Sequence, residues 1–79
     1  MANRKRARVN FQMWAIYERP SDAPQHFVVR RWEIVGDQPE PREASKHDSL
    51  EEARAAVPRG LQHINRYPND DPKIVETWI

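Results

Sequence analysis

The chain has 79 residues, no cysteine, 38% hydrophobic residues and a formal net charge of +1 at pH 7. A chain of this length is expected to form one domain that buries only about 60% of the surface exposed on unfolding, so its core is small. The absence of cysteine excludes disulfide bonds, thiolate zinc sites and cysteine nucleophiles. No apolar run approaches the roughly 20 residues that span a bilayer. We therefore expect a cytoplasmic protein that is neither secreted nor membrane-spanning.

Charge is distributed unevenly along the chain. Residues 1–10 contain four cations and no acid, namely Arg4, Lys5, Arg6 and Arg8. Residues 11–79 hold nine basic and twelve acidic side chains, which sum to −3. The first ten residues also lack periodic apolar positions, so they cannot bury enough surface to offset the cost of ordering. We expect a disordered basic arm at 1–10 and a single, mildly acidic domain at 11–79.

Two stretches rich in β-branched and aromatic residues predict the first strands, at 11–18 and 26–35. The segment between them is dense in turn formers, including Pro20 and Pro24, so the two strands are expected to form an antiparallel hairpin. Successive side chains of a strand point to opposite faces of a sheet. Both faces of each strand carry apolar bulk, which raises the question of what covers the second face of the sheet.

The chain after Gly36 gives weaker strand signals. Residues 37–42 are polar and stiffened by proline, and they predict a surface loop. Residues 43–47 are either loop or a short edge strand, and we favour the strand because lysine and polar residues suit an exposed edge. Residues 61–65 are too short a pattern to classify. The alternating apolar residues of 73–79 predict a terminal strand.

One helix has a clear start and a clear end. Ser49 followed three residues later by Glu52 is a capping box, in which each side chain accepts a hydrogen bond from an orphaned backbone donor. Apolar residues at helical spacing then predict a helix over about 50–57, and Pro58 ends it. The elements together predict an α+β fold of order β-β-(β)-α-β. In it, a small antiparallel sheet of three to four strands carries one helix packed on one face.

Five segments after residue 10 form a recognisable combination. They are Tyr17-Glu18-Arg19-Pro20, Phe27-Val28-Val29-Arg30-Arg31-Trp32, Ser49-Leu50-Glu51-Glu52-Ala53-Arg54, Pro58-Arg59-Gly60-Leu61 and Asp70-Asp71-Pro72-Lys73-Ile74-Val75-Glu76-Thr77-Trp78-Ile79. This combination resembles a family of short, uncharacterised bacterial proteins. The resemblance implies a bacterial, cytoplasmic source and brings no activity, cofactor or catalytic residue with it. The arm at 1–10 lies outside the resemblance.

Catalysis and metal binding have weak support. The chain has two glycines and contains neither a nucleophile elbow nor a glycine-rich phosphate loop. The three histidines lack the spacing of metal ligands, and sequence neighbours on a strand point apart, so adjacency does not make a catalytic pair. We therefore expect no enzymatic activity, no cofactor and no metal. The acid and base candidates considered are His26, His47, Asp48, His63, Tyr67, Asp70 and Asp71.

Protein association has broader support, because one short helix covers one face of a sheet whereas apolar bulk is expected on both. We expect a small, non-catalytic interaction or accessory domain that binds another protein or a second copy of itself. Tryptophan and arginine are residue types that anchor interfaces. The residues predicted to bind the partner, on an uncovered sheet face, are Trp14, Arg30, Trp32 and Trp78. The alternative that the same rings fill the core of a small domain carries equal weight.

Weak nucleic-acid binding is the second functional hypothesis. The four cations Arg4, Lys5, Arg6 and Arg8 could neutralise a few phosphates and give a weak, salt-sensitive affinity. Arg30 or Arg31 and a sheet tryptophan could add contacts to the bases. The net negative charge of residues 11–79 works against this hypothesis.

Overall fold

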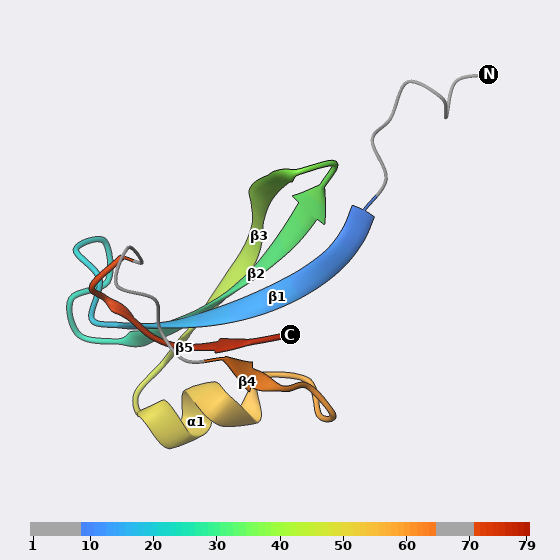
Figure 1. Ribbon diagram of the computed structural model, residues 1–79. Helices are drawn as coiled ribbons and strands as arrows, with labels where there is room; N and C mark the ends of the chain where they lie inside the picture. The colour runs from blue at the N-terminus through green and yellow to red at the C-terminus, as the bar shows by residue number, and fades with distance from the viewer. Residues whose placement is uncertain (1–8, 65–70) are drawn as a thin grey trace.

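The computed structural model describes residues 9–64 and 71–79, and Figure 1 shows how their elements are arranged. Within these ranges the chain forms one antiparallel sheet in the order β3-β2-β1-β5-β4 and one helix, α1. The bounds are β1 Val9–Glu18, β2 Phe27–Val35, β3 Gln38–His47, α1 Leu50–Ala55, β4 His63–Ile64 and β5 Ile74–Trp78. The α+β class is confirmed, but the sheet has five strands where three to four were expected.

β1 lies at the centre of the sheet and forms the predicted hairpin with β2. The pairing runs along the whole of β1, with Val9 opposite Val35 at one end and Glu18 opposite Phe27 at the other. Because β1 begins at Val9, residues 9 and 10 belong to the sheet and not to the expected arm. The rest of the predicted arm, residues 1–8, lies outside the described residues.

The predicted loop at 37–42 is wrong, because β3 runs through it and also contains the expected short strand at 43–47. Pro39 and Pro41 are two residues apart in the strand and lie opposite Ile34 and Trp32. On an edge strand, alternate N–H groups point away from the neighbouring strand, and proline is tolerated at those outward positions because no donor is needed there. A proline-rich sequence can therefore form the outer strand of a sheet, as it does here.

The predicted C-terminal strand is confirmed as β5, which is one residue shorter at each end than 73–79. The pattern did not predict β4, which has only two residues and pairs with the end of β5. Gln62 and Ile79 continue this ladder by one pair, since each backbone N–H donates to the carbonyl of the other residue at 2.7 and 2.9 Å. β4 is thus the short outer strand on the side of the sheet opposite β3.

The helix starts where the capping signal places it. Ser49 Oγ accepts a hydrogen bond from Glu52 N at 3.1 Å, and Glu52 Oε1 accepts one from Asp48 N at 3.3 Å. The Glu52 side chain therefore accepts its hydrogen bond from the backbone of Asp48, the residue before the N-cap, and not from the backbone of Ser49 itself. The helix ends at Ala55, two residues before the expected end, with Ala56 as its C-cap. None of the described residues belongs to a helix long and apolar enough to cross a membrane.

The core lies between α1 and one face of the sheet. Ile16 from β1, Val29 from β2 and Ala53 from α1 form its centre with Val57, which follows the helix. Ile16 and Ala53 are fully buried, and the small Ala53 side chain allows a close approach of helix and sheet. Figure 1 shows α1 under one end of the sheet, whereas the start of β1 and the β2–β3 turn extend beyond it.

The cap gives a direct test of the helix boundary. Replacing Ser49 with alanine leaves the Glu52 N–H without its acceptor and should lower the free energy of unfolding by about 1 kcal/mol. Urea denaturation followed by circular dichroism measures this change. Ser21→Ala, in the exposed β1–β2 loop, is the control and should shift stability by less than about 0.5 kcal/mol. Equal effects of the two substitutions would contradict the capping role.

Candidate functional site

The two faces of the sheet differ in what covers them. Residues directly opposite each other in an antiparallel pair share a face. Ile16 lies opposite Val29, and both pack against α1, so their face is here called the helix face. The other side is the helix-free face. It carries every second residue of β1 and β2, namely Phe11, Met13, Ala15, Tyr17, Val28, Arg30, Trp32 and Ile34.

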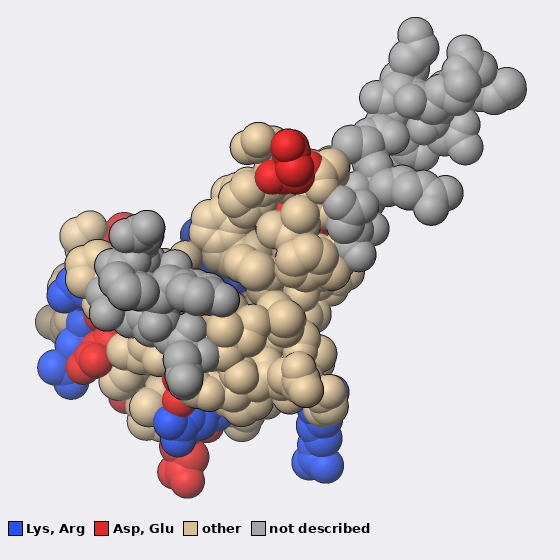
Figure 2. Space-filling view, in the orientation of Figure 1, with Lys and Arg blue, Asp and Glu red and all other residues tan. Residues whose placement is uncertain are grey.

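An apolar patch occupies the part of the helix-free face that lies away from the β1–β2 loop. Phe11 is 48% exposed and Ile79 is 38% exposed, and these are the exposed large hydrophobic residues of the described ranges. Thr77 lies opposite Ala15, and alternation from Thr77 places Ile79 on this same face. We define the apolar patch as Phe11, Met13, Trp32, Ile34, Pro39, Pro41 and Ile79. Figure 2 shows a broad uncharged surface where β1 and β5 cross the molecule, with charged side chains toward its margins.

The same strands carry ion pairs on their opposite, helix face, beyond the end of α1. Arg31 Nε donates to Glu43 Oε2 at 2.7 Å, and Arg42 Nε donates to Glu33 Oε1 at 2.7 Å. A second bond joins Arg31 to Glu33, and Arg42 also reaches Glu40 at 3.1 Å. The Arg31 hydrogen bond lowers the pKa of Glu43 to about 2 and is also the main reason that the pKa of Glu33 is lowered. We call the part of β1, β2 and β3 that lies beyond α1 the extension. One face of the extension is therefore charged and the other apolar.

The four residues predicted to bind a partner do not share one face. Trp32 and Arg30 lie on the helix-free face, as expected. Trp14 and Trp78 lie opposite each other on the helix face, where both pack against the core. The expectation that all four surround one uncovered face is wrong. The alternation along each strand gives two sets of residues, one for each face of the sheet. Which sets of neighbouring strands share a face depends on the strand register, and the sequence does not reveal the register.

Arg30 lies between the apolar patch and a neighbouring pocket. Its Nη1 donates to the Arg42 backbone carbonyl at 2.6 Å, which holds the guanidinium against β3. Arg31 has a different environment, because hydrogen bonds to Glu43 and, to a smaller extent, Glu33 raise its pKa, and both carboxylates neutralise its charge locally. Of the two arginines that were considered for phosphate contacts, only Arg30 faces the helix-free side.

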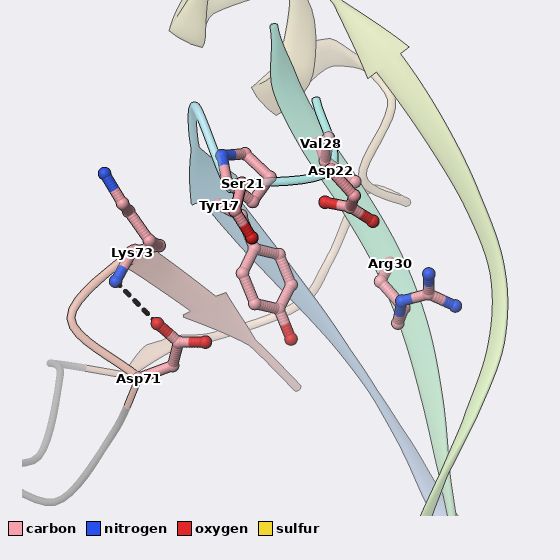
Figure 3. Close-up of a pocket in the computed structure, with 8 residues that line it drawn as sticks. Tyr17, Ser21, Asp22, Val28, Arg30, Asp71 and Lys73 are labelled. Carbon is pink, nitrogen blue, oxygen red and sulfur yellow. Dashed lines mark hydrogen bonds between the residues drawn. The ribbon is translucent and has the colours of Figure 1, made fainter. Parts of the chain in front are cut away.

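A pocket of about 530 Å³ lies at the other end of the helix-free face, beside the β1–β2 loop. Figure 3 shows the Tyr17 ring between Arg30 on one side and Asp71 with Lys73 on the other. Asp71 Oδ1 accepts a hydrogen bond from the Lys73 backbone N–H at 2.9 Å, which fixes the turn before β5. The pocket combines two cations and two carboxylates. It is lined by Tyr17, Pro20, Ser21, Asp22, Val28, Arg30, Asp71 and Lys73.

A buried carboxylate on the helix face was not singled out by the sequence reasoning. Glu76 is 8% exposed, and Arg54 from α1 donates to both of its oxygens, with Nε at 2.9 and 3.1 Å. The Trp78 indole N–H donates to Glu76 Oε1 at 3.1 Å. The Arg54 hydrogen bonds are the main reason that the pKa of Glu76 is lowered, against the opposing effect of its burial. This cluster ties the helix to β5 and is satisfied internally.

The acid and base candidates are scattered over the described structure. His26 Nε2 lies 3.8 Å from Asp48 Oδ1, and the His63 ring packs against Trp78 with centroids 5.1 Å apart. Ser45 Oγ lies 2.7 Å from His47 Nε2 at the exposed edge of β3. The described residues contain no group of three or more side chains that could hold a metal ion. Tyr67 and Asp70 lie outside the described residues, as do the arm cations Arg4, Lys5, Arg6 and Arg8.

The chain was also compared with known proteins. No protein-family model, no curated protein and no solved structure matches it.

The Glu76 cluster predicts a pH dependence of stability. Because the folded-state pKa of Glu76 lies below its ordinary value of 4.5, its ionised form stabilises the fold above that pH, and the contribution is lost as pH falls through the folded pKa. Glu76→Gln should lower the free energy of unfolding by roughly 1–2 kcal/mol at pH 7. The difference from wild type should shrink as the pH falls below 4.5. Urea titrations at several pH values measure it, and a difference that stays constant would contradict the assignment.

Proposed function

We propose that this chain is a non-catalytic interaction domain that binds another protein through the apolar patch of its helix-free face. The observation that carries the proposal is the contrast between the two faces of one extension. Its helix face is covered by ion pairs among Arg31, Glu33, Arg42 and Glu43. Its helix-free face exposes Phe11, and the exposed Ile79 at the end of β5 borders it. Apolar side chains gathered on one exposed face are typical of binding surfaces.

The chemistry of the patch favours an apolar partner segment. Trp32 is a large, rigid ring beside Met13 across the β1–β2 pair and Pro41 across the β2–β3 pair. Rings of this kind supply much contact area at a small entropic cost, and they are common anchors of interfaces. Arg30 adds a cation at the border of the patch, where it would favour a carboxylate or a carbonyl group of the partner. The expected partner is therefore an apolar segment flanked by an acidic residue.

The residues on this face support a catalytic role less well than they support binding. The charged groups of the neighbouring pocket are two cations and two carboxylates spread around an open hollow. The Ser45–His47 pair lies elsewhere, on an exposed strand edge, and the hydrogen bonds of the described residues include no carboxylate that orients the histidine ring. The proposal requires neither a cofactor nor a metal ion.

Substitution of the central ring tests the proposal. A partner captured by the full chain should bind Trp32→Ala about 30-fold more weakly, because an anchor ring typically contributes about 2 kcal/mol. Isothermal titration calorimetry with the purified partner measures the change. Glu51→Ala, on the exposed side of α1, is the control and should bind like wild type.

Two outcomes would contradict the proposal. One is equal binding of the partner by wild type and Trp32→Ala, with both variants folded by circular dichroism. The other is capture of nucleic acid in place of protein, with an affinity that disappears when residues 1–8 are deleted. The second outcome would favour the basic arm as the functional element.

A further inference from the structure

β1 is longer than its pairing with β5. It pairs with β2 from Val9 to Glu18, but β5 lies beside it only from Trp14 to Tyr17. Among the described residues, no strand pairs with the first half of β1 on the β5 side. The sheet therefore has an open edge in its middle, at residues 9–13, in addition to the two outer edges formed by β3 and β4.

The backbone alternation of β1 shows which groups face this open edge. Glu18 N donates to Lys73 O at 2.7 Å on the β5 side, and Arg19 N donates to His26 O at 2.9 Å on the β2 side. The pairing of β1 with β2 is regular from Phe11 to Glu18, so the alternation can be followed back along the strand. The N–H and C=O of Gln12 then point to the open edge. Those of Phe11 point to β2.

The open edge differs from the two outer edges in its side chains. β3 carries Pro39, Pro41 and Lys46 at outward positions, and β4 has only two residues. Prolines, charges and short length are the features that prevent an edge strand from pairing with another chain. The open segment, Val9-Asn10-Phe11-Gln12-Met13, has no charge, no proline and no glycine. It lacks these three protections, and the irregularity that it does contain is the register shift between Val9 and Phe11 in the pairing with β2.

We propose that the open edge of β1 pairs antiparallel with the same edge of a second copy of this chain. The two-fold axis would pass beside Phe11, so that Phe11 faces Phe11 of the second copy at a non-hydrogen-bonded position, where side chains approach most closely. The N–H and C=O of Gln12, which face the open edge, would then form hydrogen bonds with the backbone of the second copy. The two sheets join into one, and both helix-free faces lie on the same side of it.

Charge favours this direction of pairing. The four cations Arg4, Lys5, Arg6 and Arg8 directly precede the strand. Parallel pairing would bring eight positive charges together at one end of the interface, whereas antiparallel pairing sends the two sets to opposite ends. A second copy fits the edge because the same uncharged segment meets itself. The inference concerns the edge of the sheet and is independent of the partner proposed for its face.

Proline substitution at the open edge tests the dimer. In Gln12→Pro the missing N–H is one that the β1–β2 ladder does not use, so the monomer should remain folded while the dimer loses hydrogen bonds and gains a clash. Sedimentation equilibrium of the full chain should show wild type approaching twice the monomer mass as its concentration rises to about 1 mM. The dissociation constant of Gln12→Pro should be about tenfold higher or more.

Lys46→Pro is the matched control, because it places proline at an outward position of β3, and it should dimerise like wild type. A wild-type chain that stays monomeric throughout the series would overturn the inference. Undiminished dimerisation of Gln12→Pro, with circular dichroism confirming that it is folded, would do the same.

A second pair of variants separates the edge from the face and introduces no proline. Phe11→Glu places two carboxylates opposite each other at the axis and should abolish the dimer through like-charge repulsion. Pro39→Glu puts the same charge on the same face of β3, two strands away from the axis, and should leave the dimer intact. Loss of the dimer in both variants would mean that copies associate through the apolar patch and would overturn edge pairing, while leaving the face proposal standing.

Discussion

The unequal pairing of β1 is the constraint on which the rest of the structure depends. Nine residues of β1 pair with β2 and four pair with β5, so the sheet has five strands at one end and only β1, β2 and β3 at the other. A helix of six residues covers only the five-stranded end. The small core forms there, between Ile16, Val29 and Ala53. The three-stranded extension has no helix on either face, so its side chains are exposed to solvent or contact a partner.

The two faces of that extension expose different kinds of side chain to solvent, and this difference is the basis of the functional proposal. On the helix face, Arg31 and Arg42 are paired with carboxylates, and such surface pairs favour solubility more than stability. The helix-free face instead presents an apolar surface, which is formed by Phe11, Trp32 and the β3 prolines. The same strand pairs produce both faces, so the contrast reflects the choice of side chains and not the geometry of the backbone.

Local signals in the sequence predicted the hairpin, the Ser49 cap and the terminal strand, because each depends on residues close together in the chain. The pattern predicted the second half of β3 but took residues 37–42 for a loop, because proline is excluded from a strand only where its N–H is needed, and that depends on which edge the strand occupies. It also placed Trp14 and Trp78 with Trp32, although the strand register separates them. Register, edge position and the Arg54–Glu76 pair arise from contacts between distant residues, which periodicity cannot show.

Amide hydrogen exchange along β1, measured by NMR over a dilution series, tests the central claim that the first half of this strand has an open edge. The account predicts that the Phe11 and Met13 amides, which bond to β2, are protected at every concentration. The Gln12 amide should exchange rapidly in dilute protein and become protected as concentration rises. Protection of Gln12 at all dilutions would contradict the account, since it would mean that the edge is already covered within a single chain.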